Sequence, residues 1–257
     1  MLDSLFLFQV VLSFIISGSF AVFALWAAEK SGTKLGSIII SLPSTSAFGL
    51  LFISLIQGTD ASTQAAVATT ASLAGAFVFV FLFVKLLDKF GIISLFLALI
   101  GWFFIASLIP VLNLNIYSAF MFSFLFFVPI FILLKKIKPE KTKIKSNLKN
   151  NLFRFIMVGT IVSLIVLISK LISPFWGGIF SAFPAMYLST FYIAFRDYEP
   201  EFCKAIAANM IYAFLGFMSY SASIFFLYPL YGIVTGTIIS YLIYFIVVYT
   251  FNLLFGR

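Results

Sequence analysis

Long apolar runs alternate with short polar breaks along almost the whole chain. Because about 20 consecutive apolar residues cross the hydrocarbon core of a bilayer, each run predicts a transmembrane helix. The breaks are short, so neighbouring helices must be antiparallel. The runs predict nine spans, at residues 5–27, 36–57, 62–86, 90–109, 113–134, 153–172, 176–195, 203–227 and 230–253.

Composition supports a membrane environment and narrows the classes of function. Hydrophobic residues make up 63% of the chain and charged residues 9%, whereas soluble domains carry about 25% charged residues. The formal net charge is +8, but the basic residues cluster in one linker, so we expect no nucleic-acid partner. The chain has no histidine and a single cysteine, Cys203. We therefore expect no metal, no cofactor, no catalytic residues and no enzymatic activity.

The basic residues also predict the orientation in the membrane. The longest polar stretch, Lys135 to Arg154, carries seven lysines and one arginine, and the positive-inside rule places it in the cytoplasm. The N-terminus then lies outside and the C-terminus inside, which puts fifteen of the 16 basic residues on the inner side. We expect a multi-pass protein of a prokaryotic plasma membrane, with this linker touching anionic lipid headgroups.

The first part of the chain is similar to the last part at an offset of 141 residues. Without a gap, Phe14 to Leu108 aligns with Phe155 to Tyr249 with thirteen identities. Apolar matches carry little weight in such a chain, but more glycines coincide than chance predicts, and glycine has backbone and packing reasons to stay in place. The paired glycines are Gly18 with Gly159, Gly36 with Gly177, Gly75 with Gly216 and Gly91 with Gly232, and Pro43 falls on Pro184.

This internal similarity predicts an inverted repeat. Each half has four helices and one helix lies between them, so the second half is upside down relative to the first. The predicted parts are a four-helix half (1–109), a spacer helix (110–134), a basic cytoplasmic linker (135–152) and an inverted four-helix half (153–257). This all-α plan of nine helices recurs in transporters and some channels, although a fold alone does not establish transport.

A compact pattern of about 50 residues occurs once in each half. It has a small-residue turn, an aliphatic stretch, a proline, and later an Ala-rich helix that runs into aromatic residues. Its main residues are Gly36, Pro43, Gly177, Gly178, Phe183 and Pro184. On these residues the chain resembles the GlpM-like family of small membrane proteins, which implies two fused four-helix units and brings no catalytic motif. The first half departs from the pattern, since Leu42 stands where the aromatic residue precedes proline.

Two prolines inside apolar runs mark the candidate site. Pro43 and Pro184 each remove an amide donor and therefore predict breaks in the second and seventh helices. The freed backbone groups and nearby hydroxyls form a binding site for a polar solute, or the hydroxyls only re-satisfy the broken backbone. Asn209 is expected to face the bundle interior. The candidate binding residues are Ser41, Pro43, Ser44, Thr45, Ser46, Ser181, Pro184, Tyr187 and Asn209, with Gly36, Gly75, Gly177, Gly178 and Gly216 as structural glycines.

The leading hypothesis for function is a membrane transporter or channel-like protein for a small solute or ion. No acidic residue lies deep within a predicted span, which disfavours coupling to protons. The alternative is a non-transporting accessory or scaffold factor in envelope or lipid metabolism. That alternative predicts tightly packed helix breaks without a hydrated cavity between them.

Overall fold

The protein is all-helical throughout the part of the chain that the structure, a computed structural model, describes, which is residues 3–30, 42–137 and 147–256. The α-helices are α1 (Ser4–Lys30), α3 (Ser44–Gln57), α4 (Thr59–Phe90), α5 (Ile93–Leu108), α6 (Ile116–Leu134), α7 (Leu148–Leu171), α8 (Pro174–Ser181), α9 (Ala185–Asp197), α10 (Pro200–Met210) and α11 (Phe214–Phe255). Two short 3-10 helices, η1 (Ile109–Val111) and η2 (Ile211–Ala213), follow α5 and α10.

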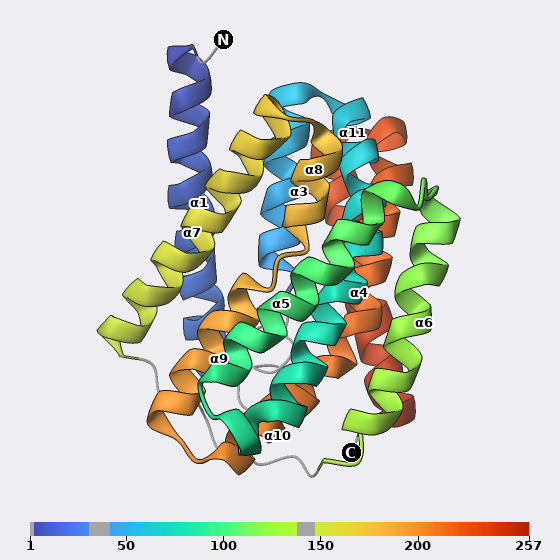
Figure 1. Ribbon diagram of the computed structural model, residues 1–257. Helices are drawn as coiled ribbons and strands as arrows, with labels where there is room; N and C mark the ends of the chain where they lie inside the picture. The colour runs from blue at the N-terminus through green and yellow to red at the C-terminus, as the bar shows by residue number, and fades with distance from the viewer. Residues whose placement is uncertain (1–2, 31–41, 138–146, 257) are drawn as a thin grey trace.

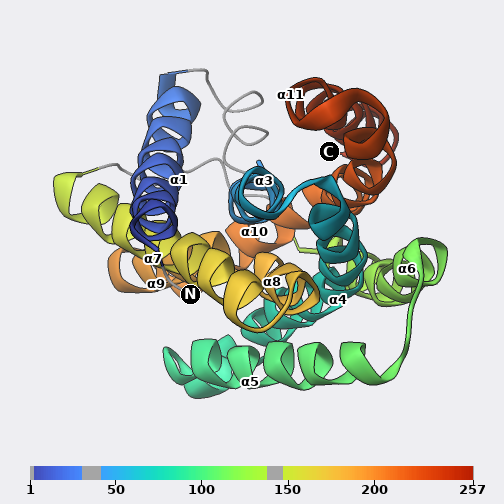
Figure 2. The same cartoon turned by 90° about the horizontal axis from the view of Figure 1, so that it is seen from above.

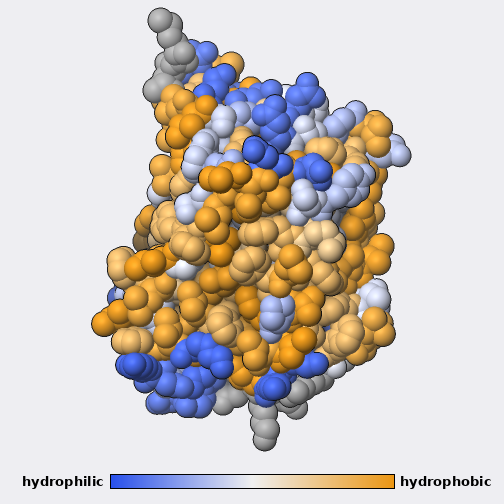
Figure 3. Space-filling model, turned by 45° about the vertical axis from the view of Figure 1, so that its right-hand side comes forward, coloured by the Kyte–Doolittle hydropathy of each residue, from blue (hydrophilic) through white to orange (hydrophobic). Residues whose placement is uncertain are grey.

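The outer surface of the bundle is apolar. Seven helical segments within the described ranges are long and apolar enough to cross a membrane. Large side chains point outward from α5 and α6, where Phe96 is 65% exposed and Leu125 is 68% exposed. Figure 3 shows hydrophobic residues between two ends at which hydrophilic residues gather. Such a surface is stable against lipid and not against water, so this is a multi-pass membrane protein.

Helix α4 forms the centre of the bundle. Seen from above, it lies between α3, α8, α11 and α6 (Figure 2), and it contacts all four of them. Alanines such as Ala65, Ala68 and Ala71 are fully buried along it, and their small side chains let neighbouring helices approach closely. The closest approach is made by Gly178 of α8, which lies directly on the backbone of Ala65.

Helices α1 and α7 cross in opposite directions through a reciprocal contact (Figure 1). Gly18 of α1 lies on the carbonyl oxygen and ring of Phe155, and Gly159 of α7 lies on the carbonyl oxygen and ring of Phe14. The two rings pack edge to face with their centroids 5.3 Å apart. Each member of this contact is related to another member by the offset of 141 residues.

Helix α11 consists of two antiparallel arms. Its backbone is non-helical at Gly232, where φ is 75° and ψ is 175°, a conformation that favours glycine. The hydroxyls of Tyr228 and Thr237 are hydrogen-bonded at 2.8 Å across the turn, and the rings of Phe217 and Tyr244 stack with centroids 5.9 Å apart. The chain therefore reverses here, between the predicted spans 203–227 and 230–253.

Three predicted boundaries need comment. Of the predicted span 36–57, the structure describes only α3 and the two residues before it, so Gly36 and Ser41 lie outside the described residues. The basic linker was predicted to reach residue 152, which is wrong, because α7 already begins at Leu148, where the side chain of Asn147 accepts a hydrogen bond from the N–H of Asn150 at 2.8 Å. The predicted continuous span 203–227 is interrupted by η2.

Candidate functional site

A cavity of about 40 Å³ lies where the two proline-containing segments meet. It is lined by Pro43 and the first turn of α3 on one side, and by Pro184 and the first turn of α9 on the other. Such a volume is enough for a few water molecules, since one needs at least about 10–15 Å³. The structure therefore brings together two segments that the sequence separates by 141 residues.

The two sides of this cavity are made by equivalent residues. Ten of its lining residues form five pairs that are related by the offset of 141. These pairs are Leu42 with Phe183, Pro43 with Pro184, Thr45 with Met186, Ser46 with Tyr187, and Ala76 with Phe217. An accidental surface pocket has no reason to follow the internal similarity of the sequence.

The backbone takes the same turn at both prolines. Pro43 has φ −73° and ψ 51°, and Pro184 has φ −79° and ψ 47°. In each turn the N–H of the next residue donates to the carbonyl oxygen of the preceding residue, at 2.7 Å for Ser44 and 2.8 Å for Ala185. This is an inverse γ-turn. The predicted break at Pro184 is present, since α8 ends at Ser181 and α9 begins at Ala185.

The carbonyl groups that the break at Pro184 frees are bonded to side chains. Ser46 Oγ donates to the carbonyl of Ser181 at 2.8 Å, and Trp102 Nε1 donates to that of Ala182 at 3.1 Å. One turn earlier, Thr69 Oγ1 donates to the carbonyl of Gly178 at 2.9 Å. These donors act structurally, because they satisfy backbone groups that lipid cannot satisfy.

Two other hydroxyls line the cavity without such a role. Ser44 is 2% exposed and Tyr187 is 7% exposed, and neither hydroxyl has a hydrogen-bond partner among the residues that the structure describes. A buried hydroxyl left unpaired costs about 1–3 kcal/mol. Both groups are therefore free to bond a molecule that enters the cavity.

The remaining candidate residues have different places. Thr45 lines the cavity beside Ser46. Ser181 lies behind the wall, where its hydroxyl donates to the carbonyl of Gly177 at 2.9 Å. The expectation that Asn209 faces the bundle interior is wrong, because Asn209 is exposed on α10; α10 ends one residue later, so this part of the predicted span is not enclosed by other helices. The cavity lining does not include it.

The structural glycines that can be placed all allow close contacts between elements. Gly75 lies on Trp102, Gly177 on Ser169, Gly178 on Ala65 and Gly216 on Tyr244 and Val248. Trp102 was not a candidate from the sequence. Its indole N–H within an apolar run was the available signal, because such a donor needs a partner in the membrane.

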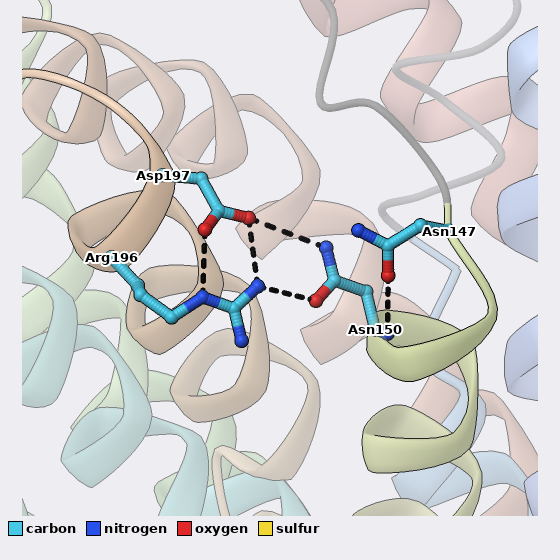
Figure 4. A network of polar contacts seen from close by, with 4 residues as sticks. All are labelled: Asn147, Asn150, Arg196 and Asp197. Atoms are coloured by element: carbon cyan, nitrogen blue, oxygen red, sulfur yellow. Dashed lines mark hydrogen bonds and ion pairs between the residues drawn. The ribbon is translucent and has the colours of Figure 1, made fainter.

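A second polar cluster joins two helix ends and is structural (Figure 4). Arg196 forms an ion pair with Asp197 at 2.6 Å and also donates to the Oδ1 of Asn150 at 2.6 Å. Asn150 belongs to the first turn of α7, which Asn147 caps. This network ties the end of α9 to the start of α7. Its charged groups are about one third exposed, so we expect it to contribute little to stability.

Comparison with known proteins gives one match. The model of a family described as a protein of unknown function (DUF3147) matches residues 151–255. No curated protein and no solved structure matches the chain. The matched range is close to the predicted second half, residues 153–257. This part of the chain is therefore similar to a family of unknown function, and the resemblance to the GlpM-like family stays a prediction.

Proposed function

We propose that this chain is a membrane transporter or channel-like protein for a small solute or ion, with nine transmembrane helices in an inverted repeat. The seven candidate spans become nine when α3 is counted with its preceding residues and when the segment Pro200–Phe255 is divided at Gly232. The reciprocal contact of α1 with α7 supports two halves of opposite orientation, as do the matching proline turns. The family match to residues 151–255 supports a second half that is a unit by itself.

The observation that carries this proposal is the cavity between Pro43 and Pro184. It is lined by equivalent residues of both halves, which is the position of substrate sites in transporters built from inverted repeats. Its unpaired hydroxyls favour binding over a purely structural break. In the proposed mechanism the two halves move against each other, and the turns at the prolines absorb the change in backbone angles.

Solute flux into liposomes tests the proposal. The purified protein is reconstituted, and uptake of chloride, nitrate, potassium, glycerol and urea is compared with uptake by empty liposomes. We expect at least one solute to enter faster with the protein present. Pro43→Ala and Pro184→Ala are each expected to lower that flux at least roughly tenfold, a barrier change of about 1.4 kcal/mol, because alanine allows a continuous helix through the break.

Pro129→Ala is the matched control for these two variants. Pro129 also lies inside a helix, but it is exposed on α6 and does not line the cavity. Its flux is expected to equal that of the wild type. Absence of flux for the whole panel contradicts transport and favours the accessory or scaffold role, and equal flux in all three proline variants contradicts the proposed mechanism.

The nine-helix topology is tested by the location of the chain ends. The start of α1 and the end of α11 lie at opposite ends of the bundle (Figure 1). With an odd number of crossings, a tag at the N-terminus is expected outside the cell and a tag at the C-terminus inside. Protease accessibility of both tags in intact cells measures this. Two tags on one side of the membrane mean an even number of crossings and end the inverted-repeat interpretation.

A further inference from the structure

The cavity receives the amino-terminal ends of two helices. Helix α3 begins directly after Pro43 and helix α9 directly after Pro184, and neither helix has a side-chain cap. The first N–H groups of an α-helix have no partner within the helix, and the aligned peptide dipoles give this end about half a positive charge. Both helices are longer than three turns, at 14 and 13 residues. Two positive helix ends therefore meet at one small cavity.

The negative helix end at this place is already covered. Helix α8 ends at Ser181, and its last carbonyl groups point toward donors from other helices. Thr69, Ser46 and Trp102 bond the carbonyls of Gly178, Ser181 and Ala182. A cation entering the cavity would have to displace these donors, whereas an anion would not. The arrangement thus favours a negative charge over a positive one.

Side chains add hydrogen-bond donors and no charge. The hydroxyls of Ser44 and Tyr187 line the cavity, are more than nine-tenths buried and have no partner among the described residues. No charged residue is among its lining residues within the described ranges. A multiply charged anion would need lysine or arginine to offset its loss of hydration. Two hydroxyls and two helix ends suit a single negative charge.

We propose that this cavity binds a small monovalent anion, held by the hydroxyls of Ser44 and Tyr187 and by the first N–H groups of α3 and α9. The cavity volume of about 40 Å³ limits the ligand to a halide or an anion of similar size, such as nitrate. This inference rests on the proposed function, since it names the class of solute held at the same place. It can be tested without any measurement of transport.

Bromide is the probe for the binding experiment. The full chain in detergent is unfolded by heat at increasing sodium bromide, with sodium gluconate keeping the ionic strength constant, because gluconate is too large for the cavity. A ligand that binds only the folded protein raises the midpoint temperature in proportion to its occupancy. We expect bromide to raise the midpoint. Ser44→Ala and Tyr187→Phe should each weaken the apparent affinity at least roughly tenfold, since each removes a hydrogen bond to a charged ligand.

Two matched variants control for general effects of losing a buried hydroxyl. Ser72 and Tyr220 are also fully buried, and their hydroxyls also have no partner among the described residues, but neither residue lines the cavity. Ser72→Ala and Tyr220→Phe are expected to bind bromide as the wild type does. An unchanged midpoint in bromide, or the same weakening in all four variants, overturns the inference.

The outcome also separates this inference from the proposed function. Bromide binding that Ser44→Ala abolishes, in a protein that moves no solute, keeps the anion site and removes transport. Flux of glycerol, urea or potassium without any effect of bromide keeps transport and removes the anion site. Flux of chloride and nitrate alone, lowered in Ser44→Ala and Tyr187→Phe, supports both.

Discussion

Gly178→Ala is expected to lower the free energy of unfolding by about 3 kcal/mol, the upper end of the usual range for overpacking a core. An added Cβ at this position would overlap the carbonyl oxygen and the Cα of Ala65 in the central helix. Those are backbone atoms of a buried helix, so they cannot turn away as the end of a side chain can. Helix α8 would have to move off α4, which also strains the bond from Thr69 to the carbonyl of Gly178. The measurement is reversible unfolding in mixed micelles with increasing SDS.

Gly101→Ala is the control for this variant. An added Cβ at Gly101 meets only side-chain atoms, first the Cδ1 of Leu82 and then the Cγ1 of Val78, and the end of a leucine side chain can change rotamer. Alanine also favours the helix by about 1 kcal/mol relative to glycine. We therefore expect a change within about 1 kcal/mol in either direction. Equal losses for the two variants would show that α8 does not lie against α4 as closely as described.

The crossing of α1 and α7 predicts a pair of equal effects. Gly18→Ala and Gly159→Ala should each cost about 2 kcal/mol, because each added Cβ would lie less than 3.0 Å from a backbone carbonyl oxygen, that of Phe155 at 2.8 Å or that of Phe14 at 2.9 Å. The two contacts are reciprocal, so the two losses should agree. The double variant should lose less than the sum, since the first substitution already separates the helices.

Ile15→Ala and Ile156→Ala form the matched control pair. These residues are also related by the offset of 141, but they lie on outward faces, with 49% and 47% of their surface exposed. Each substitution is expected to cost less than about 1 kcal/mol, because surface substitutions have small effects. Clearly unequal losses for Gly18→Ala and Gly159→Ala, or full additivity in the double variant, would contradict the reciprocal crossing.

Much of the fold was predictable from local patterns in the chain. Apolar runs marked α1, α4, α5, α6 and α7 with ends close to those observed, because a span must satisfy its backbone within one continuous helix and must present apolar side chains to lipid. Pro184 marked a helix break, since proline removes a donor wherever it lies. The end of the basic linker was less predictable, because the cap at Asn147 depends on one hydrogen bond to the N–H of Asn150.

Candidate site residues were less predictable, for a physical reason. A hydroxyl in a membrane helix has the same sequence signal whether it bonds its own backbone, braces a broken helix or lines a cavity. Ser181, Ser46 and Ser44 do these three things in turn. Asn209 shows the limit of such reasoning, because its cost of burial predicted a partner inside the bundle, whereas the residue is exposed.

The amino-acid order alone settles the membrane class, the helical content and the places where helices break, because these follow from the chemistry of each segment and its solvent. The distances between segments settle everything about the site. Whether Pro43 and Pro184 meet, and which hydroxyls are left without a partner there, depends on how α3, α8 and α9 pack around α4. Packing depends on the shapes of side chains that are far apart in sequence, and no local pattern encodes that.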